Sequence, residues 1–160
     1  MKWAIVTLTK SGSELGRKLS DKIPGSVLYT LPGRGDYLSE EIKGSLKEFT
    51  ASVFNQYDII IFIMATGIVV RTISGLINDK ETDPGVLVMD EKGKFVISLL
   101  SGHLGGANMG AEYVAGLTGA TAVITTATDV NGMVSPDMLA VKLGAVIDDM
   151  SICKTVTAVM

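Results

Sequence analysis

The sequence predicts an α/β fold, a three-layer sandwich with a mostly parallel sheet and one antiparallel hairpin. Short apolar runs that are typical of buried strands alternate with segments whose apolar residues recur at helical spacing. The strongest run, residues 58–64, is apolar on both faces, which is typical of a central strand with helices above and below it. We expect one α/β domain over residues 1–150, with residues 151–160 beginning a linker or a further domain.

The first third of the chain predicts two further strands and two helices. Residues 3–8 and 27–31 are apolar runs of strand length. Between them, residues 11–14 (SGSE) have the spacing of a capping box, which predicts a helix that begins at Ser11. Apolar residues recur every three or four positions over residues 39–55, which predicts an amphipathic helix there.

The middle of the chain predicts a helix followed by a hairpin. A helix is expected over residues 68–77, directly after the central strand. Residues 86–90 and 95–100 flank the turn-forming residues 91–94 (EKGK), which predicts two antiparallel strands at an edge of the sheet.

The last third predicts a helix, a strand and a second helix. Residues 107–117 carry small residues at helical spacing, so this helix can approach the sheet closely, and residues 122–126 read as a strand. Ser135 and Pro136 have the pattern of an N-cap and a first helical residue, which predicts a helix to about residue 143. The whole alternation is typical of a Rossmann-like, doubly wound arrangement.

Composition and charge exclude several classes of protein. The formal net charge of −3 and the lack of a basic stripe argue against a nucleic-acid partner. The single cysteine and single histidine argue against a disulfide or a metal cluster. The longest apolar run, residues 59–65, is too short to cross a membrane, and the N-terminal residues lack a signal-peptide pattern. We therefore expect a cytoplasmic protein with no membrane partner.

Residues 101–108 (SGHLGGAN) are the segment in which catalytic or ligand-binding groups are most expected. They hold the lone histidine, His103, and three glycines between a predicted strand and a predicted helix. Unpaired N–H groups at such a helix start can bind an anion or an oxyanion, and an imidazole titrates near neutrality. In the alternative interpretation, Gly105 and Gly106 only allow the helix and strand to touch, and His103 only caps a helix.

If the sheet is doubly wound, four strand ends should converge on one rim of the sheet and carry polar groups there. The side chains expected on that rim are His103, Asn108, Lys10, Arg71, Thr66 and Asp129. Lys80 lies in a charged loop, and such loops are usually only solvated surface. The glycine-rich phosphate motifs are absent, so a nucleotide- or phosphate-binding module is supported by fold analogy alone.

Five segments occur in an order and spacing that match a known family. They are residues 65–71 (ATGIVVR), 79–84 (DKETDP), 86–91 (VLVMDE), 95–108 (ending in SGHLGGAN) and 124–129 (ITTATD). Together they resemble the N-terminal part of CbiG, the cobalt-precorrin-5A hydrolase family of anaerobic cobalamin (vitamin B12) biosynthesis. The resemblance covers residues 58–143.

The resemblance implies hydrolytic opening of a corrinoid δ-lactone with release of acetaldehyde. His103 is then the candidate base, with Asp129 as a second candidate for the carbon–carbon cleavage. Backbone donors of residues 105–107 could stabilise an oxyanion, and cations could pair with substrate carboxylates. The candidate substrate-binding residues are Lys10, Thr66, Gly67, Arg71, Lys80, Gly102, Gly105, Gly106 and Asn108. No cofactor is expected, because the cobalt arrives with the corrinoid substrate.

The resemblance implies a further C-terminal domain, which we do not expect within these 160 residues; the sequence is then either a piece of a longer chain or one of two polypeptides. A partner polypeptide could supply that domain, and residues 152–159 could pair with another sheet edge in a homodimer. An alternative function is therefore a corrinoid-binding domain whose chemistry lies in the C-terminal domain. Corrinoid binding without acetaldehyde release would distinguish this alternative from the hydrolase.

Overall fold

The computed structural model describes residues 1–132, 139 and 143–144. The chain divides into two compact units, Met1–Val123 and Ile124–Met160. The second unit contains one short described helix, α5 (Ala127–Val130). The expected domain boundary at residue 150 and the tail lie outside the described residues, as does the helix expected over residues 135–143 apart from residues 139 and 143.

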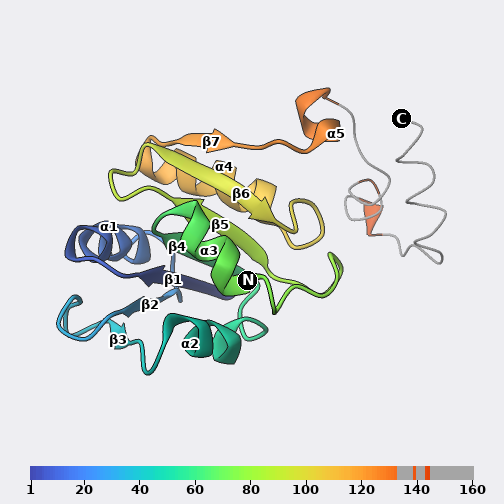
Figure 1. The fold of residues 1–160 in the computed structure, drawn as a ribbon. Helices are drawn as coiled ribbons and strands as arrows, with labels where there is room; N and C mark the ends of the chain where they lie inside the picture. Colours follow the sequence, from blue (N-terminus) through green and yellow to red (C-terminus); the bar gives the residue numbers. More distant parts are fainter. Residues whose placement is uncertain (133–138, 140–142, 145–160) are drawn as a thin grey trace. The chain divides into compact units, whose positions relative to one another are not determined.

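The first unit is built on a seven-stranded sheet with the strand order β3-β2-β1-β4-β5-β6-β7 (Figure 1). Every neighbouring pair is parallel except β5 and β6, which are antiparallel. The mostly parallel sheet with one antiparallel pair is thereby confirmed. The strands are β1 (Trp3–Thr7), β2 (Val27–Thr30), β3 (Glu40–Glu41), β4 (Ile59–Ile63), β5 (Gly85–Met89), β6 (Phe95–Leu100) and β7 (Thr121–Val123).

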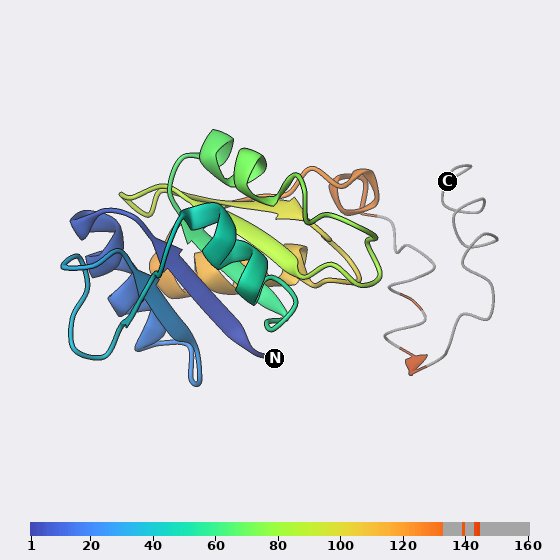
Figure 2. The same cartoon turned by 60° about the horizontal axis from the view of Figure 1, so that its bottom comes forward.

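Helices cover both faces of the sheet, which confirms the three-layer prediction. In Figure 2, α2 (Leu46–Val53) and α3 (Thr66–Ile73) cover one face, while α1 (Lys10–Ser20) and α4 (Ala107–Thr118) lie behind the sheet on the other. Because β4 is central and covered on both sides, all five of its side chains are fully buried. Each such side chain stabilises the fold by about 1.5–3 kcal/mol.

Three details of the expected elements are corrected by the structure. Helix α1 begins at Lys10, one residue earlier than expected, because Thr9 and not Ser11 is its N-cap. Helix α2 begins at the N-cap Ser45, where Glu48 completes a capping box, and not near residue 39. The antiparallel hairpin is not at the edge of the sheet, because β7 pairs alongside β6.

Candidate functional site

The expected convergence of four strand ends on one rim is wrong. Strands β1, β4 and β5 run in the same direction, whereas β6 runs antiparallel to β5. The segment after β6 therefore emerges at the edge where β4 and β5 begin, and the segments after β1 and β4 emerge at the opposite edge. Strands of five residues at about 3.3 Å per residue keep these two edges about 17 Å apart.

We name the edge after β6 the histidine edge. It carries His103 in the segment between β6 and α4, and Lys80 in the exposed loop that precedes β5. The other predicted residues of this edge are Gly102, Gly105, Gly106 and Asn108. His103 is half-buried, so its imidazole is neither enclosed in the core nor fully in solvent.

Backbone hydrogen bonds close the segment between β6 and α4 on itself. The N–H of Gly106 donates to the His103 carbonyl at 3.0 Å, and the N–H of Ala107 donates to the Ser101 carbonyl at 3.2 Å. The N–H of Asn108 donates to the Gly102 carbonyl at 2.9 Å. The N–H groups of Gly106 and Ala107, two of the expected oxyanion donors, are therefore already hydrogen-bonded in this conformation, and their role as donors stays a prediction.

The glycines of the histidine edge allow close backbone approach. A Cβ atom on Gly105 would lie 2.9 Å from the Ser101 carbonyl oxygen and 3.0 Å from the Asp83 carbonyl oxygen. A Cβ atom on Gly102 would lie 2.8 Å from the Asn108 side-chain oxygen. Gly106 has φ 78°, a left-handed conformation that glycine adopts at little cost. These three glycines therefore have a clear packing role.

Asn108 holds the start of α4 against the sheet. Its side chain is buried, and its Oδ1 accepts a hydrogen bond of 2.6 Å from the Ser98 hydroxyl of β6. Since a polar side chain buried with a partner stabilises a fixed geometry, the Asn108 amide orients the segment that carries His103.

A hollow of about 410 Å³ adjoins Gly105 and Leu104 at the histidine edge. Its lining includes the carboxylates of Asp58, Glu81 and Asp83. Asp83 is buried and accepts hydrogen bonds from the backbone N–H of Asn78, so it holds the loop before β5. Asp58 and Glu81 are exposed, and Asp58 lies 3.9 Å from the N-terminal ammonium of Met1, which also lines the hollow. The lining is still acidic overall and would repel a ligand that carries many carboxylates.

The opposite edge, which we name the switch edge, carries Lys10, Thr66, Gly67 and Arg71. It lies where connections leave the neighbouring strands β1 and β4 toward opposite faces, the position at which doubly wound sheets bind ligands. Lys10 is the first residue of α1, and Thr66 and Gly67 are the first two of α3. Arg71 is exposed and donates from Nη1 to the Gly67 carbonyl at 3.1 Å.

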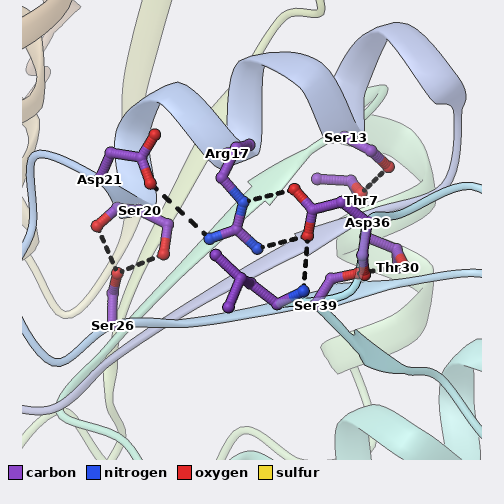
Figure 3. Close-up of polar contacts among 10 residues, drawn as sticks. Thr7, Ser13, Arg17, Ser20, Asp21, Ser26, Thr30, Asp36 and Ser39 are labelled. Atoms are coloured by element: carbon purple, nitrogen blue, oxygen red, sulfur yellow. Dashed lines mark hydrogen bonds and ion pairs between the residues drawn. The ribbon is translucent and has the colours of Figure 1, made fainter.

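A hollow of about 370 Å³ at the switch edge has a basic lining. It contains Lys10, Arg17, Lys18 and Arg34, against the two acids Glu14 and Asp36. Figure 3 shows Arg17 paired with Asp36, through hydrogen bonds of 2.7 Å from Nε and 2.9 Å from Nη2. These bonds lower the pKa of Asp36 and fasten the loop after β2 onto α1. The other three cations make this hollow the better electrostatic match for carboxylates.

Sequence reasoning did not find Glu91, which follows β5 at the switch edge. Its carboxylate accepts hydrogen bonds from the Thr9 hydroxyl at 2.6 Å and the Ser11 hydroxyl at 2.7 Å. These two bonds, with a smaller contribution from Lys92, lower the pKa of Glu91. No local pattern could have revealed a contact between residues some 80 positions apart.

Asp129 lies on α5 in the second unit, where it is exposed. It therefore stays a prediction from the sequence. Within the residues that the structure describes, no group of three histidine, cysteine, aspartate or glutamate side chains could hold a metal ion. The same residues include no helix that is long and apolar enough to cross a membrane.

Comparison with known proteins matches residues 48–129, about half of the chain, to the family model of the cobalamin synthesis G N-terminal domain. The chain belongs to this family. Over 151 residues it is 44% identical to the cobalt-precorrin-5A hydrolase of Salmonella typhimurium, covering 92% of the chain and 42% of that relative. The cobalt-precorrin-5A hydrolase of Priestia megaterium is 40% identical over 147 residues, covering 89% of the chain and 39% of the relative.

A solved structure supports the same assignment. The crystal structure of a cobalamin biosynthesis protein G homologue from Sulfolobus solfataricus matches with a TM-score of 0.59 and 25% identity, covering 98% of this chain and 45% of that one. The chain thus spans about two-fifths of the length of the curated relatives that it matches.

Proposed function

We propose that this chain is the N-terminal part of a cobalt-precorrin-5A hydrolase, and that it opens a δ-lactone on a cobalt-corrinoid with release of acetaldehyde. The observation that carries the proposal is its 44% identity, over nearly the whole chain, to the Salmonella typhimurium enzyme of that name. The half-buried imidazole at the histidine edge supports it, because lactone opening needs a group that accepts a proton and later returns it.

In this proposal His103 removes a proton from the attacking nucleophile and later protonates the leaving oxygen. Lys80 belongs to the same edge and is the candidate cation for a substrate carboxylate there. Because Lys10, Thr66, Gly67 and Arg71 lie at the switch edge, they do not join His103 around one reacting centre. If they bind the corrinoid, they contact it at a second place on the protein. Asp129 is kept as the second candidate base.

The test uses the chain with cobalt-precorrin-5A, and measures acetaldehyde together with the mass of the corrinoid product. We expect the wild-type chain to release acetaldehyde, and His103→Ala to lower the rate about 10²–10⁴-fold with an unchanged thermal midpoint. A matched control is Glu112→Gln, an exposed position on α4, which should release acetaldehyde at the wild-type rate.

Three results would change the proposal. Near-normal release by His103→Ala would remove the imidazole from the mechanism. Corrinoid binding without release by the wild-type chain would favour a binding domain that relies on the rest of the enzyme for chemistry. Neither binding nor release would reject the proposed function for this chain.

A further inference from the structure

Ser101 departs from ordinary structure in two independent ways. Its φ of 55° makes it the one non-glycine residue in the left-handed region among the residues that the structure describes. Its hydroxyl oxygen is buried and has no hydrogen-bond partner within the same described part of the chain. Thr50, inside α2, has the other such hydroxyl.

Neither departure helps the fold. A left-handed φ is unfavourable for a residue with a Cβ atom, and glycine would adopt it with little strain. A buried hydroxyl without a partner loses its hydrogen bonds to water and gains none in return, so alanine would be better at this position. A strained residue and an orphaned polar atom both point toward function, and here they coincide in one side chain.

The place of Ser101 in the chain resembles that of a nucleophilic serine. It lies directly after β6, in the sharp connection to α4, and such strand–turn–helix corners present the reactive serine in many acyl-transfer enzymes. The chain's one imidazole follows two residues later, on the same short segment. Gly105 packs closely against Ser101, because a Cβ atom on Gly105 would overlap the Ser101 Cβ atom.

We propose that the Ser101 hydroxyl is an acyl-transfer nucleophile, which makes the lactone opening of the proposed function a two-step reaction. In the first step, Oγ bonds to the lactone carbonyl carbon, the ring C–O bond breaks, and His103 carries the Oγ proton to the leaving oxygen. In the second step, water attacks the resulting ester, the Oγ–C bond breaks, and His103 returns a proton to Oγ. The carboxylate is then released and the serine is regenerated.

The proposal requires the segment between β6 and α4 to move, since the Ser101 Oγ is buried in the structure. The segment is held by the three backbone hydrogen bonds from Gly106, Ala107 and Asn108. Opening it would free the Gly106 and Ala107 N–H groups, the donors that an oxyanion needs. One movement would thus expose the nucleophile and supply its oxyanion donors.

The first test is independent of the corrinoid. The wild-type chain is treated with a fluorophosphonate, from which an activated serine oxygen displaces fluoride to form a phosphonate ester, and the adduct is located by peptide mass spectrometry. We expect one adduct on Ser101, none in Ser101→Ala, and labelling at least 10-fold slower in His103→Ala. Thr50→Val, which removes the other orphaned hydroxyl, should label at the wild-type rate.

The second test separates a catalytic serine from a merely structural one. Ser101→Gly removes the hydroxyl and relieves the strained φ, so its Tm should rise by about 2–4 °C. A catalytic serine predicts that this more stable variant releases acetaldehyde at least 10²-fold more slowly than wild type. A structural serine predicts the same rise in Tm with release unchanged, and that result would overturn the proposal.

The outcomes also separate this proposal from the proposed function on which it rests. Acetaldehyde release by a wild-type chain that forms no Ser101 adduct overturns the nucleophile and leaves the hydrolase function standing. A Ser101 adduct in a chain that releases no acetaldehyde supports the nucleophile and rejects the hydrolase function for this chain.

Discussion

The connections from β1 to α1 and from β6 to α4 meet the same requirement in different ways. Each must satisfy the free N–H groups at a helix start. At α1, the Thr9 hydroxyl accepts a hydrogen bond of 3.0 Å from the Gly12 N–H, and it donates to Glu91. At α4 no side chain caps the helix, and the preceding backbone folds back to accept the hydrogen bonds itself.

The difference between the two connections shows where the molecule tolerates strain. The first is closed by the side chains of Thr9, Ser11 and Glu91, which are hydrogen-bonded to one another or to the backbone, so stability alone explains these three residues. The second depends on close glycine packing, a left-handed serine and an orphaned hydroxyl. Because the fold offers a relaxed solution elsewhere, the strained one at the histidine edge is the better candidate for chemistry.

The largest expected effect on stability is at Gly105. In Gly105→Ala the new Cβ would contact the Ser101 side chain and two carbonyl oxygens, those of Ser101 and Asp83. Since two of these three contacts are with backbone, the corner must shift, and we expect a loss of about 1–3 kcal/mol in the free energy of unfolding by urea denaturation.

Gly116→Ala is the matched control for this variant. Gly116 is an exposed residue inside α4, and a Cβ atom there would meet nothing within 4 Å. The substitution should stabilise the protein by up to about 1 kcal/mol, because alanine loses less backbone entropy in a helix. If both variants changed the free energy of unfolding equally, the interpretation that Gly105 is needed for close packing would be wrong.

In the connection from β1 to α1 we expect a substitution of Thr9 to have a smaller effect on the free energy of unfolding. Thr9→Val keeps the shape of the side chain but removes both the N-cap of α1 and one hydrogen bond to Glu91. The expected cost is about 1 kcal/mol in the free energy of unfolding. Thr121→Val, at an exposed position of β7, should stay within about 0.5 kcal/mol of wild type. Equal stability of the two variants would contradict a capping role for Thr9.

Strong periodic signals in the sequence predicted much of the fold correctly. Strand β6 lies over residues 95–100 as expected, and β4 is central and buried because its run is apolar on both faces. Helix starts were less predictable where two capping patterns compete. Both Thr9 and Ser11 can cap α1, and the direct connection from β1 favours Thr9. Before α2, Gly44 has φ 75° and Ile42 donates to the Thr30 carbonyl, so the helix cannot extend back to residue 39.

The site was harder to predict, because the order and direction of the strands decide which of its residues lie at the same edge of the sheet. The hairpin was expected, and it reverses β6, so the separation of His103 from Lys10 and Thr66 was implicit in the sequence. The strain at Ser101 was not, since a serine after a strand has no distinctive pattern until its φ is known. Glu91 reaches Thr9 only because β5 and β1 end at the same edge.

The smallest expected effect is the contribution of Glu91 to the pH dependence of the free energy of unfolding. It reports on the hydrogen bonds between Glu91 and the connection from β1 to α1. Because hydrogen bonds from Thr9 and Ser11 lower its folded pKa, Glu91 contributes stability above its unfolded pKa of about 4.3 and loses it as the pH falls through the lower folded value. Glu91→Gln should therefore lose less stability than wild type between about pH 5 and pH 3. The difference in the free energy of unfolding should be under about 1 kcal/mol, because this site is solvated.

Glu48→Gln is the control for this variant, because the pKa of Glu48 is also lowered, by the Ser45 cap of another helix. The same comparisons are then made in a Ser11→Ala background. There, the difference in pH dependence between Glu91 and Glu91→Gln should shrink, and the difference between Glu48 and Glu48→Gln should stay unchanged. Equal shrinkage at both would show that the Ser11 hydroxyl does not hold the Glu91 carboxylate.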